Sequence, residues 1–560
     1  MRHKWLLPSL LAGICFVTTL DCGFVYDDLY HVVHATQALG DTSLTNLIRA
    51  VTTDIWTFST SSHREDLQQS SVYYRPGQSL FLMLTFAYAG TKAWLWHLTS
   101  LLIHAIATCL VYFVILRSLR QNNIDNEASA LVCASVFAVH PVQSESVAWI
   151  AASSTPLAAV FILLSLLAYL KVKEHKLWLA VSAASYAVAI FTKELAITLP
   201  LLLLGYELFI LDKTPSTKAW FKRCVVYSLP FIAVTLTYLL IRYKIIGILL
   251  SVDATNPNFP DFPPMSRQMQ LYTLPKVLFT YLKNLALPLW LSPFYPVYPI
   301  KQPDLLNFYL PLLVVVACLA ILTIASLRSF EIRLATIWLL VPLVPALEIK
   351  AFKLEHLVFD RYLYLSVVGF GLLISYLARQ LANKLNKSEA SRTASLLSGV
   401  IASLLLAMAI NQNFIWENEW TYWSAAYRAV PQSCVANIEM GRLSIDRGLR
   451  KEAITYLEQA RTACPLSTAF NFQLAILYIE NQEYEKAKAE LLHLLKHAPN
   501  KATAAVYYDL ALIYEIEGTL SSAKVFYEKA IEKSPDSEIA SQAKQRLKLL
   551  QATADQRPKD

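Results

Sequence analysis

Residues 24–30 have the sequence Phe-Val-Tyr-Asp-Asp-Leu-Tyr (FVYDDLY) and follow an apolar segment at the start of the chain. Two adjacent carboxylates, Asp27 and Asp28, therefore lie just after the end of a segment that is apolar enough to span a membrane. Such carboxylates usually face an aqueous cavity and often mark a functional site. The alternative is a solvated pair at the membrane surface, where charges cost little. The rest of the chain favours the first interpretation.

The chain divides into two parts of contrasting composition. Of its 560 residues, 55% are hydrophobic and only 16% are charged, which is too apolar for a soluble protein of this size. Apolar runs split by short polar loops fill residues 1–415, whereas Glu, Lys, Ala and Tyr are frequent after residue 434. We therefore predict an all-α protein with a polytopic helical membrane domain (1–415), a linker (416–433), a soluble helical domain (434–552) and a tail (553–560).

The net charge of +8 is carried mostly by short loops between apolar runs. Lys and Arg in such loops orient membrane helices, so we expect no nucleic-acid partner. The spacing of the eight cysteines indicates no metal site. No cofactor is predicted, and carboxylates such as Asp27 can act with or without a divalent metal.

Apolar runs predict about eleven membrane spans. We expect the N-terminal run to be a retained first helix rather than a cleaved signal peptide. Arg2 and Lys4 place the N-terminus in the cytoplasm, so that the first outer loop (21–93) and the C-terminus lie outside. This topology requires that 77–89 and 271–291 do not cross. The predicted spans are 5–20, 94–116, 128–139, 156–170, 177–191, 195–211, 224–243, 305–327, 334–349, 362–378 and 394–410.

The soluble part contains a repeat. Ala453 and Ala487 are 34 residues apart, as are Pro465 and Pro499. Small residues and a closing proline at this period are typical of tetratricopeptide helix pairs. The predicted repeats are 434–467, 468–501 and 504–537, followed by a capping helix at 538–551, which meets the usual minimum for a stable solenoid.

Cys434 and Cys464 fall at the start and the end of the first predicted helix pair. In such a hairpin the start of the first helix lies beside the end of the second. If this part of the chain lies outside, the oxidising compartment favours a disulfide between them.

Unusual polar residues collect at the predicted outer ends of the spans. An anionic base beside several cations suits a reaction that deprotonates a hydroxyl and expels a phosphate. Each residue also has a structural alternative: the pair Lys193–Glu194 could be a neutral break between helices, and Arg361 with Tyr362 an interfacial anchor. The residues are Asp27, Asp28, Tyr74, Arg75, His140, Glu145, Lys193, Glu194, Arg242, Asp360, Arg361 and Tyr362.

In this order the motifs resemble those of the GT-C glycosyltransferases, and within them the transmembrane and tetratricopeptide-repeat O-mannosyltransferases, which are related to the protein O-mannosyltransferases. HPxxxExVAW and TKE followed by LP are specific, whereas an isolated Asp-Asp is not. The resemblance covers nearly the whole chain. The matching stretches are FVYDDLYHVV (24–33), YYRPGQSLFLML (73–84), WHLTSLLIHA (96–105), VFAVHPVQSESVAWI (136–150), FTKELAITLPLLLL (191–204), DRYLYLSVVGFGLL (360–373) and the C-terminal repeats.

The resemblance implies transfer of a sugar, often mannose, from a polyprenyl phosphate to an acceptor on the lumenal or periplasmic side. It implies Asp27, supported by Asp28, as the catalytic base. Donor-phosphate binding would fall to Arg75, Lys193, Arg242 and Arg361, and shaping of the cavity to His140, Glu145 and Tyr362. The chain departs from the family where Ser153 and Thr155 replace the usual Arg and Asp, which leaves the sugar and the acceptor open.

We expect the acceptor to be an exported protein held by the repeats, with membrane lipid around the body. We expect a bacterial inner membrane rather than endoplasmic reticulum, because three repeats are few. Two alternatives stay open. One is a non-catalytic tetratricopeptide scaffold for envelope assembly, which would not need Asp27, and the other is a transferase acting on a lipid or polysaccharide.

Overall fold

The structure is a computed structural model that describes residues 3–59, 73–122, 124, 126–211, 217–249, 265–352, 355–385 and 388–555. These residues are helical or irregular, and none of them forms a strand, which confirms the all-α prediction. They separate into two compact units: unit 1 lies within residues 3–425 and unit 2 within residues 426–555.

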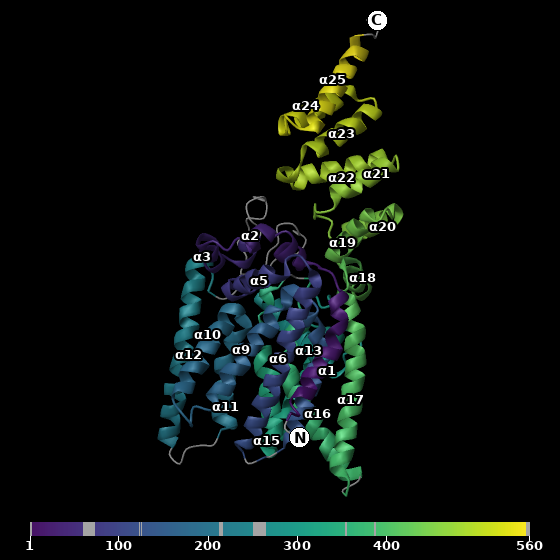
Figure 1. Ribbon diagram of the computed structural model, residues 1–560. Helices are drawn as coiled ribbons and strands as arrows, with labels where there is room; N and C mark the ends of the chain where they lie inside the picture. Colours follow the sequence, from purple (N-terminus) through teal and green to yellow (C-terminus); the bar gives the residue numbers. More distant parts are fainter. Residues whose placement is uncertain are drawn as a thin grey trace. The chain divides into compact units, whose positions relative to one another are not determined.

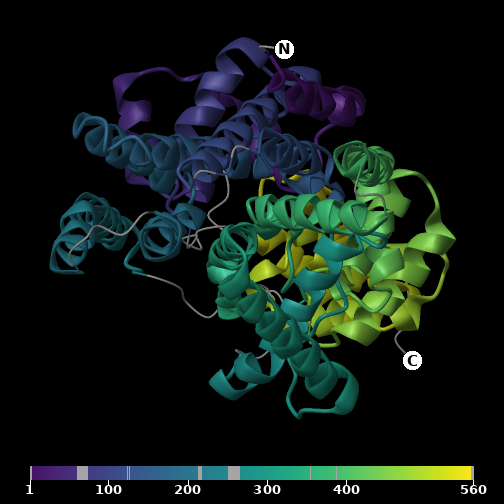
Figure 2. The ribbon, with the colours of Figure 1, turned by 90° about the horizontal axis from the view of Figure 1, so that it is seen from below.

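In unit 1 the long helices run side by side, and α2, α3 and α5 lie at one end of them (Figure 1). Figure 2 looks along the direction of these long helices. The helices of unit 1 are α1 (Leu6–Phe16), α2 (Thr36–Gly40), α3 (Leu44–Thr52), α4 (Ile55–Ser59), α5 (Pro76–Ala89), α6 (Ala93–Arg120), α7 (Glu127–Val139), α8 (Ser144–Val147), α9 (Ser154–Tyr169), α10 (Leu177–Thr192), α11 (Leu199–Phe209), α12 (Thr217–Ile246), α13 (Arg267–Ala286), α14 (Leu310–Arg328), α15 (Phe330–Leu340), α16 (Ser366–Leu385) and α17 (Ala390–Asn413); α18 (Glu419–Ala429) spans the boundary between the units.

Within the described residues, six helices are long and apolar enough to cross a membrane. They are Ala93–Arg120, Ile150–Tyr169, Trp220–Ile246, Leu305–Arg328, Phe330–Leu347 and Ala390–Trp416, and all six coincide with predicted spans. Three shorter apolar helices, at Leu6–Asp21, Glu127–Val139 and Leu177–Thr192, coincide with three more. The protein is therefore a membrane protein, as its composition indicates.

The predicted outer loop folds into a small helical cap on unit 1. Its short helices α2 to α4 and the helix α5 share one apolar core, which includes Val32, Phe58 and Leu82. Trp96 of α6 and Ile150 belong to the same core, so the cap packs directly on the ends of the spanning helices. The cap thereby fixes the position of the segment that follows α1.

Asn413, at the end of α17, joins the first and last of the predicted spans. Its Nδ2 donates to the backbone oxygen of Cys15 at 2.8 Å, and its Oδ1 accepts from Ser144 Oγ at 2.9 Å. The side chain is buried, so both bonds are shielded from water. The ends of α1, α8 and α17 are thus held at one point.

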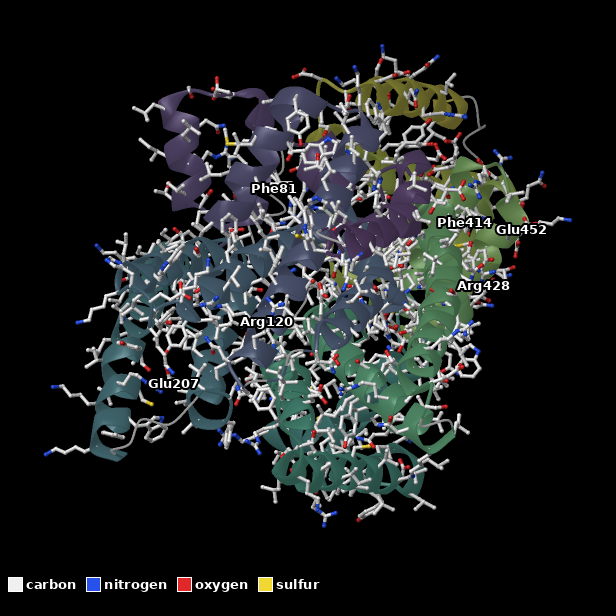
Figure 3. All side chains as sticks on the ribbon, turned by 60° about the horizontal axis from the view of Figure 1, so that its bottom comes forward. Phe81, Arg120, Glu207, Phe414, Arg428 and Glu452 are labelled. Carbon is white, nitrogen blue, oxygen red and sulfur yellow. A yellow bond between two sulfur atoms is a disulfide. The ribbon has the colours of Figure 1, made fainter. Side chains whose placement is uncertain are left out.

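At the opposite end of the helices, a buried carboxylate holds three helices together. Glu207, labelled in Figure 3, accepts from Arg223 Nη2 at 2.6 Å and from Tyr169 Oη at 2.8 Å. It is 3% exposed. An ion pair at such a site is stabilising only when hydrogen bonds satisfy both partners, as Tyr169 helps to do here.

Unit 2 is a row of antiparallel helix pairs. The pairs are α19 (Cys434–Asp446) with α20 (Arg450–Ala463), α21 (Asn471–Glu480) with α22 (Tyr484–His497), and α23 (Ala504–Ile516) with α24 (Leu520–Lys533), and α25 (Glu538–Asp555) follows. Small buried residues at the predicted repeat positions let paired helices approach closely: a Cβ on Gly441 would collide with Leu457. This part of the chain is therefore a repeat of helix pairs, as predicted.

The turn between the two helices of each pair repeats in the same way. Gly448, Gln482 and Gly518 all have positive φ, of 73°, 62° and 77°. The first two are 34 residues apart and the third follows 36 residues later, in line with the two residues that separate the predicted repeats 468–501 and 504–537. Glycine adopts this left-handed conformation without strain, whereas Gln482 does so at a cost.

Cys434 and Cys464 form the predicted disulfide, with their Cα atoms 5.9 Å apart. We expect reduction of this bond to destabilise unit 2 by about 2–4 kcal/mol, because the unfolded chain is released from a closed loop. Hydrogen exchange of residues 434–467 with and without reductant measures the effect. The double variant Cys434→Ser/Cys464→Ser, which cannot form the bond, should not respond to reductant. Quantitative alkylation of both thiols in the native, unreduced protein would contradict the prediction.

Candidate active site

The FVYDDLY stretch forms a tight turn after α1. The backbone N–H of Asp28 donates to the Val25 oxygen at 3.0 Å, and Tyr26 is left-handed with φ of 53°. The Asp28 carboxylate is fully buried and accepts from the backbone N–H groups of Ala151 at 2.7 Å and Val25 at 3.2 Å. Burial raises the pKa of Asp28 to about 8. Asp28 therefore clamps the turn to the segment before α9.

Asp27 is placed differently from its neighbour. Its side chain is only partly buried. Its charge and that of Glu145 act on Tyr422, whose pKa is raised above the usual range by burial first and then by neighbouring groups that include both carboxylates. Arg361 opposes this shift. Asp27 thus lies near enough to Tyr422 to share its electrostatic environment with Glu145 and Arg361.

The start of α5 approaches α9 and α10. Gln78 Nε2 donates to the backbone oxygen of Ala151 at 3.2 Å, so the 150–152 segment is held by Asp28 on one side and Gln78 on the other. A Cβ on Gly77 would lie 2.6 Å from Thr192 Oγ1. Only glycine permits this approach, which brings Arg75 next to the end of α10.

Arg75 and Glu194 form a two-bond ion pair. Arg75 Nε donates to Glu194 Oε2 at 2.7 Å, and Nη2 pairs with Oε1. Burial by itself raises the pKa of Glu194, but the Arg75 charge outweighs it and lowers this pKa to about 2. The Arg75 guanidinium also lies 4.4 Å from the centre of the Tyr73 ring. This fork-to-carboxylate geometry fixes the orientation of Arg75.

Arg361 and Glu145 form a second pair of the same kind. Glu145 accepts from Arg361 Nη1 and, at 3.1 Å, from the Arg361 backbone N–H. The guanidinium lies 3.9 Å from the centre of the Phe359 ring and 5.2 Å from that of Trp149. Aromatic faces around a guanidinium add cation–π stabilisation and exclude water.

Lys193 lies within electrostatic range of both pairs. It is 4% exposed, and its Nζ donates to Thr155 Oγ1 at 2.5 Å and to Ser154 Oγ at 3.5 Å. Among the residues that the structure describes, no carboxylate lies within ion-pair distance of it. Burial, and then the positive charges of Arg75 and Arg361, lower the pKa of Lys193 well below its usual range, against the influence of Glu194 and Glu145.

Tyr362 lies within electrostatic range of both pairs. Its ring centre is 5.9 Å from the Arg361 guanidinium. The charges of Arg361, Glu194 and Arg75 also act on its side chain. The structure thus brings together Arg75, Lys193, Arg361, Glu145 and Tyr362 from the predicted set.

His140 and Arg242 make contacts with the backbone. The His140 ring accepts from the Val142 N–H at Nδ1 (3.3 Å) and donates from Nε2 to the Leu285 oxygen (2.9 Å). Burial lowers the pKa of His140 to about 4, so it braces the loop as a neutral ring. Arg242 Nε donates to the Ile248 oxygen at 3.2 Å, and Tyr238, one turn earlier, donates to the Tyr74 oxygen.

Sequence reasoning missed two groups of residues. One is the hydroxyl pair Ser154 and Thr155, which accepts from Lys193; the sequence indicated Thr155 only as a departure from the family. The other is a set of aromatic rings from residues 414–423, the segment FIWENEWTYW, most of which was predicted to be linker. Its Trp416, Tyr422 and Trp423 lie in unit 1. The density of aromatic residues directly after the last span is the signal that could have indicated their role.

No three His, Cys, Asp or Glu side chains come together as a metal-ligand group in the described part of the chain. The two carboxylates nearest the cations, Glu145 and Glu194, each hold an arginine. The arrangement provides a partly exposed carboxylate, Asp27, at the same end of the helices as two guanidinium groups and the Lys193 amine. This combination can accept a proton from a hydroxyl and stabilise a departing phosphate.

Comparison with known proteins shows similarity in both parts of the chain. Residues 444–511 and 504–537 match tetratricopeptide-repeat families. The chain is 24% identical to protein O-mannosyl-transferase TMTC3 of Mus musculus, over 96% of this chain and 60% of the relative. It is 25% identical to human protein O-mannosyl-transferase TMTC1, over 82% of this chain and 55% of the relative. The resemblance drawn from the motifs is confirmed.

The chain spans about 60% of the length of the first of these relatives. Among solved structures, the oligosaccharyltransferase of Archaeoglobus fulgidus in its apo form matches 81% of this chain and 59% of its own, with 11% identity and a TM-score of 0.39.

Proposed function

We propose that this chain is a membrane glycosyltransferase of the GT-C class, which transfers a sugar, with mannose as the first candidate, from a polyprenyl phosphate to hydroxyl groups of exported proteins. The observation that carries the proposal is the position of Lys193. Its buried amine lies within electrostatic range of two internally neutral Arg–Glu pairs and has hydroxyl groups as its hydrogen-bond partners among the described residues. The similarity to O-mannosyl-transferases supports the choice of reaction.

Asp27 acts as the base in this proposal. The hydroxyl of a Ser or Thr side chain gives its proton to the Asp27 carboxylate, and its oxygen forms a bond to the anomeric carbon of the sugar. The bond between this carbon and the phosphate oxygen breaks, and its electron pair leaves with the phosphate. Attack opposite the leaving group inverts the anomeric centre. Asp28, whose carboxylate holds backbone N–H groups, keeps the turn in place.

The cations act on the leaving phosphate. Arg75 and Arg361 are each neutralised by a glutamate, whereas Lys193 has only hydroxyl partners among the described residues. A sugar–phosphate–lipid diester carries one negative charge, which favours the protonated form of Lys193, and the resulting ammonium balances this charge. Charge that develops on the departing phosphate is then stabilised in a site from which water is largely excluded, where such interactions are strongest. Arg242 is a further candidate at the edge of this group.

Unit 2 binds the acceptor protein in this proposal. Helix-pair repeats present an extended surface that suits an unfolded polypeptide. We place the repeats on the outer side of the membrane, as the Lys/Arg bias of the loops indicates. The disulfide in the first repeat supports this assignment, because such bonds persist in oxidising compartments. A bacterial periplasm is the compartment we favour.

The decisive experiment uses the full-length protein in detergent with radiolabelled polyprenyl-phosphate mannose and a pool of unfolded exported proteins. We expect label to enter protein and to be released by alkaline β-elimination, which marks a link to Ser or Thr. Nucleotide-linked mannose serves as the control donor and should give no transfer. Label that enters only the lipid fraction would favour a lipid-modifying transferase. Capture of exported proteins without transfer from any lipid-phosphate sugar would favour a non-catalytic tetratricopeptide scaffold. The repeats are the observation that supports this second candidate.

A further inference from the structure

Five aromatic residues surround the turn that carries Asp27, and we refer to Tyr26, Trp149, Trp416, Tyr422 and Trp423 as the aromatic cluster. The Tyr26 ring lies 5.5 Å from those of Tyr422 and Trp423 and 5.8 Å from that of Trp149, centre to centre. Trp149 stacks on Trp416 at 5.8 Å. The cluster therefore unites residues from the first loop, the segment before α9, and the segment after α17.

The cluster contains three indole N–H groups that lack an acceptor. Trp149, Trp416 and Trp423 are 6%, 3% and 1% exposed, and their Nε1 atoms have no hydrogen-bond partner within the described residues. Indole N–H groups usually find a partner when they are buried. Three such donors in one cluster indicate a ligand that brings hydrogen-bond acceptors to them.

Tyr26 adds a second, independent observation. Tyr26 and Gln482 are the two residues other than glycine with positive φ in the described chain. A bulky residue in this conformation is strained, and such strain persists where the surroundings hold the residue for function. The strain orients the Tyr26 ring into the aromatic cluster, next to Asp27, while the side chain keeps part of its surface accessible.

We propose that the aromatic cluster is the subsite for the sugar that is transferred, with Tyr26 as the ring on which the sugar stacks. This inference rests on the proposed function and adds the residues that recognise the sugar. A pyranose ring has a face of C–H groups that packs on an aromatic face, and a rim of hydroxyl groups that accept from indole N–H donors. The aromatic cluster offers both kinds of contact.

The position of the cluster fits this role. Asp27 follows Tyr26 directly, and the Arg361 guanidinium lies over Trp149, 5.2 Å from its ring centre. A sugar held there would have the candidate base on one side and the cations for the phosphate on the other. The same geometry would bring the anomeric carbon between the two groups that must act on it.

Binding of two lipids to the purified full-length protein tests the inference without reference to catalysis. One lipid is polyprenyl-phosphate mannose and the other is polyprenyl phosphate without sugar. We expect the wild type to prefer the mannosylated lipid by about tenfold, the ratio that corresponds to one good contact. Tyr26→Gly should abolish this preference, and Tyr26→Phe should keep it. Trp423→Phe, which removes one indole N–H, should reduce the preference.

The variants separate recognition from folding. Glycine accepts positive φ without strain, so Tyr26→Gly keeps the turn while it loses the ring contacts, and its unfolding temperature is measured beside its binding. Tyr30→Leu removes a ring that packs on Trp56, outside the aromatic cluster, and should leave the preference unchanged. An unchanged preference in Tyr26→Gly would overturn the inference. A Tyr26→Gly variant with a raised KM for the acceptor polypeptide and an unchanged preference between the lipids would assign the cluster to the acceptor, and would also overturn the inference. Failure of the wild type to bind either lipid would overturn the proposed function, and the inference with it.

Discussion

Replacement of Asp27 by Asn is expected to lower kcat for sugar transfer by about 10²- to 10⁴-fold, the usual contribution of a general base. The amide keeps the size of the carboxylate but cannot accept the proton of the acceptor hydroxyl. Because Asp27 is partly exposed, loss of its charge should leave the unfolding temperature unchanged. Transfer from polyprenyl-phosphate mannose, measured at saturating donor, checks the prediction.

Asp28→Asn is the matched control. It should lower stability by about 1–3 kcal/mol, because its amide N–H would face a backbone N–H of Ala151 or Val25 in a buried site. The two neighbouring substitutions should therefore have different effects. Asp27→Asn removes activity from a stable protein, whereas Asp28→Asn destabilises the fold. A stable but inactive Asp28→Asn together with an active Asp27→Asn would exchange the two roles.

Lys193→Met is expected to lower kcat/KM by about 10²- to 10³-fold, as does loss of one preorganised donor to a developing anion. The flexible apolar chain of methionine fills the place of the lysine stem, so the loss reports the ammonium rather than a cavity. Donor-binding measurements should show weaker affinity for the phosphate in the same variant. Wild-type affinity and rate in Lys193→Met would remove Lys193 from the phosphate site.

The role of Lys193 in phosphate binding also predicts how donor affinity changes with pH. Lys193 is charged below its pKa and neutral above it, and burial with the Arg75 and Arg361 charges lowers that pKa well below the usual range. Affinity for the donor phosphate should therefore be highest at low pH and fall as the pH rises through this lowered pKa. Lys193→Arg stays charged throughout. Its affinity should lack this fall, and Lys193→Met should be weak at every pH. A wild-type affinity that rises with pH would contradict the assignment.

The sequence predicts the helices of the fold better than it predicts which charged side chains pair with each other. Alternation of apolar runs with basic loops gives the direction of each helix, and so predicts that Arg75, Lys193 and Arg361 share one end. It does not tell which charge meets which. Glu194 follows Lys193 directly, yet it pairs with Arg75, 119 residues away. Lys193 has extended backbone angles, φ −155° and ψ 132°, and consecutive side chains on extended backbone point in opposite directions.

The two aspartates illustrate the same limit. FVYDDLY identifies them as a pair, but their roles differ because the left-handed Tyr26 turns one carboxylate towards backbone N–H groups. The aromatic residues after α17 were assigned to a linker because composition alone does not show that a segment folds back on the first loop. The Gly23 N–H donates to the Glu417 backbone oxygen at 2.8 Å, which shows that the segment after α17 lies against the first loop.

Asn413 has a consequence for the order in which the protein is made. It joins the end of the first predicted span to that of the last one, and the aromatic cluster is completed by Trp423. Asp27 is synthesised early, but its surroundings are assembled from residues that leave the ribosome nearly 400 positions later. A nascent or truncated chain that lacks the last span is therefore without a complete site. The bond at Asn413 closes the helix bundle only after every other predicted span has been made.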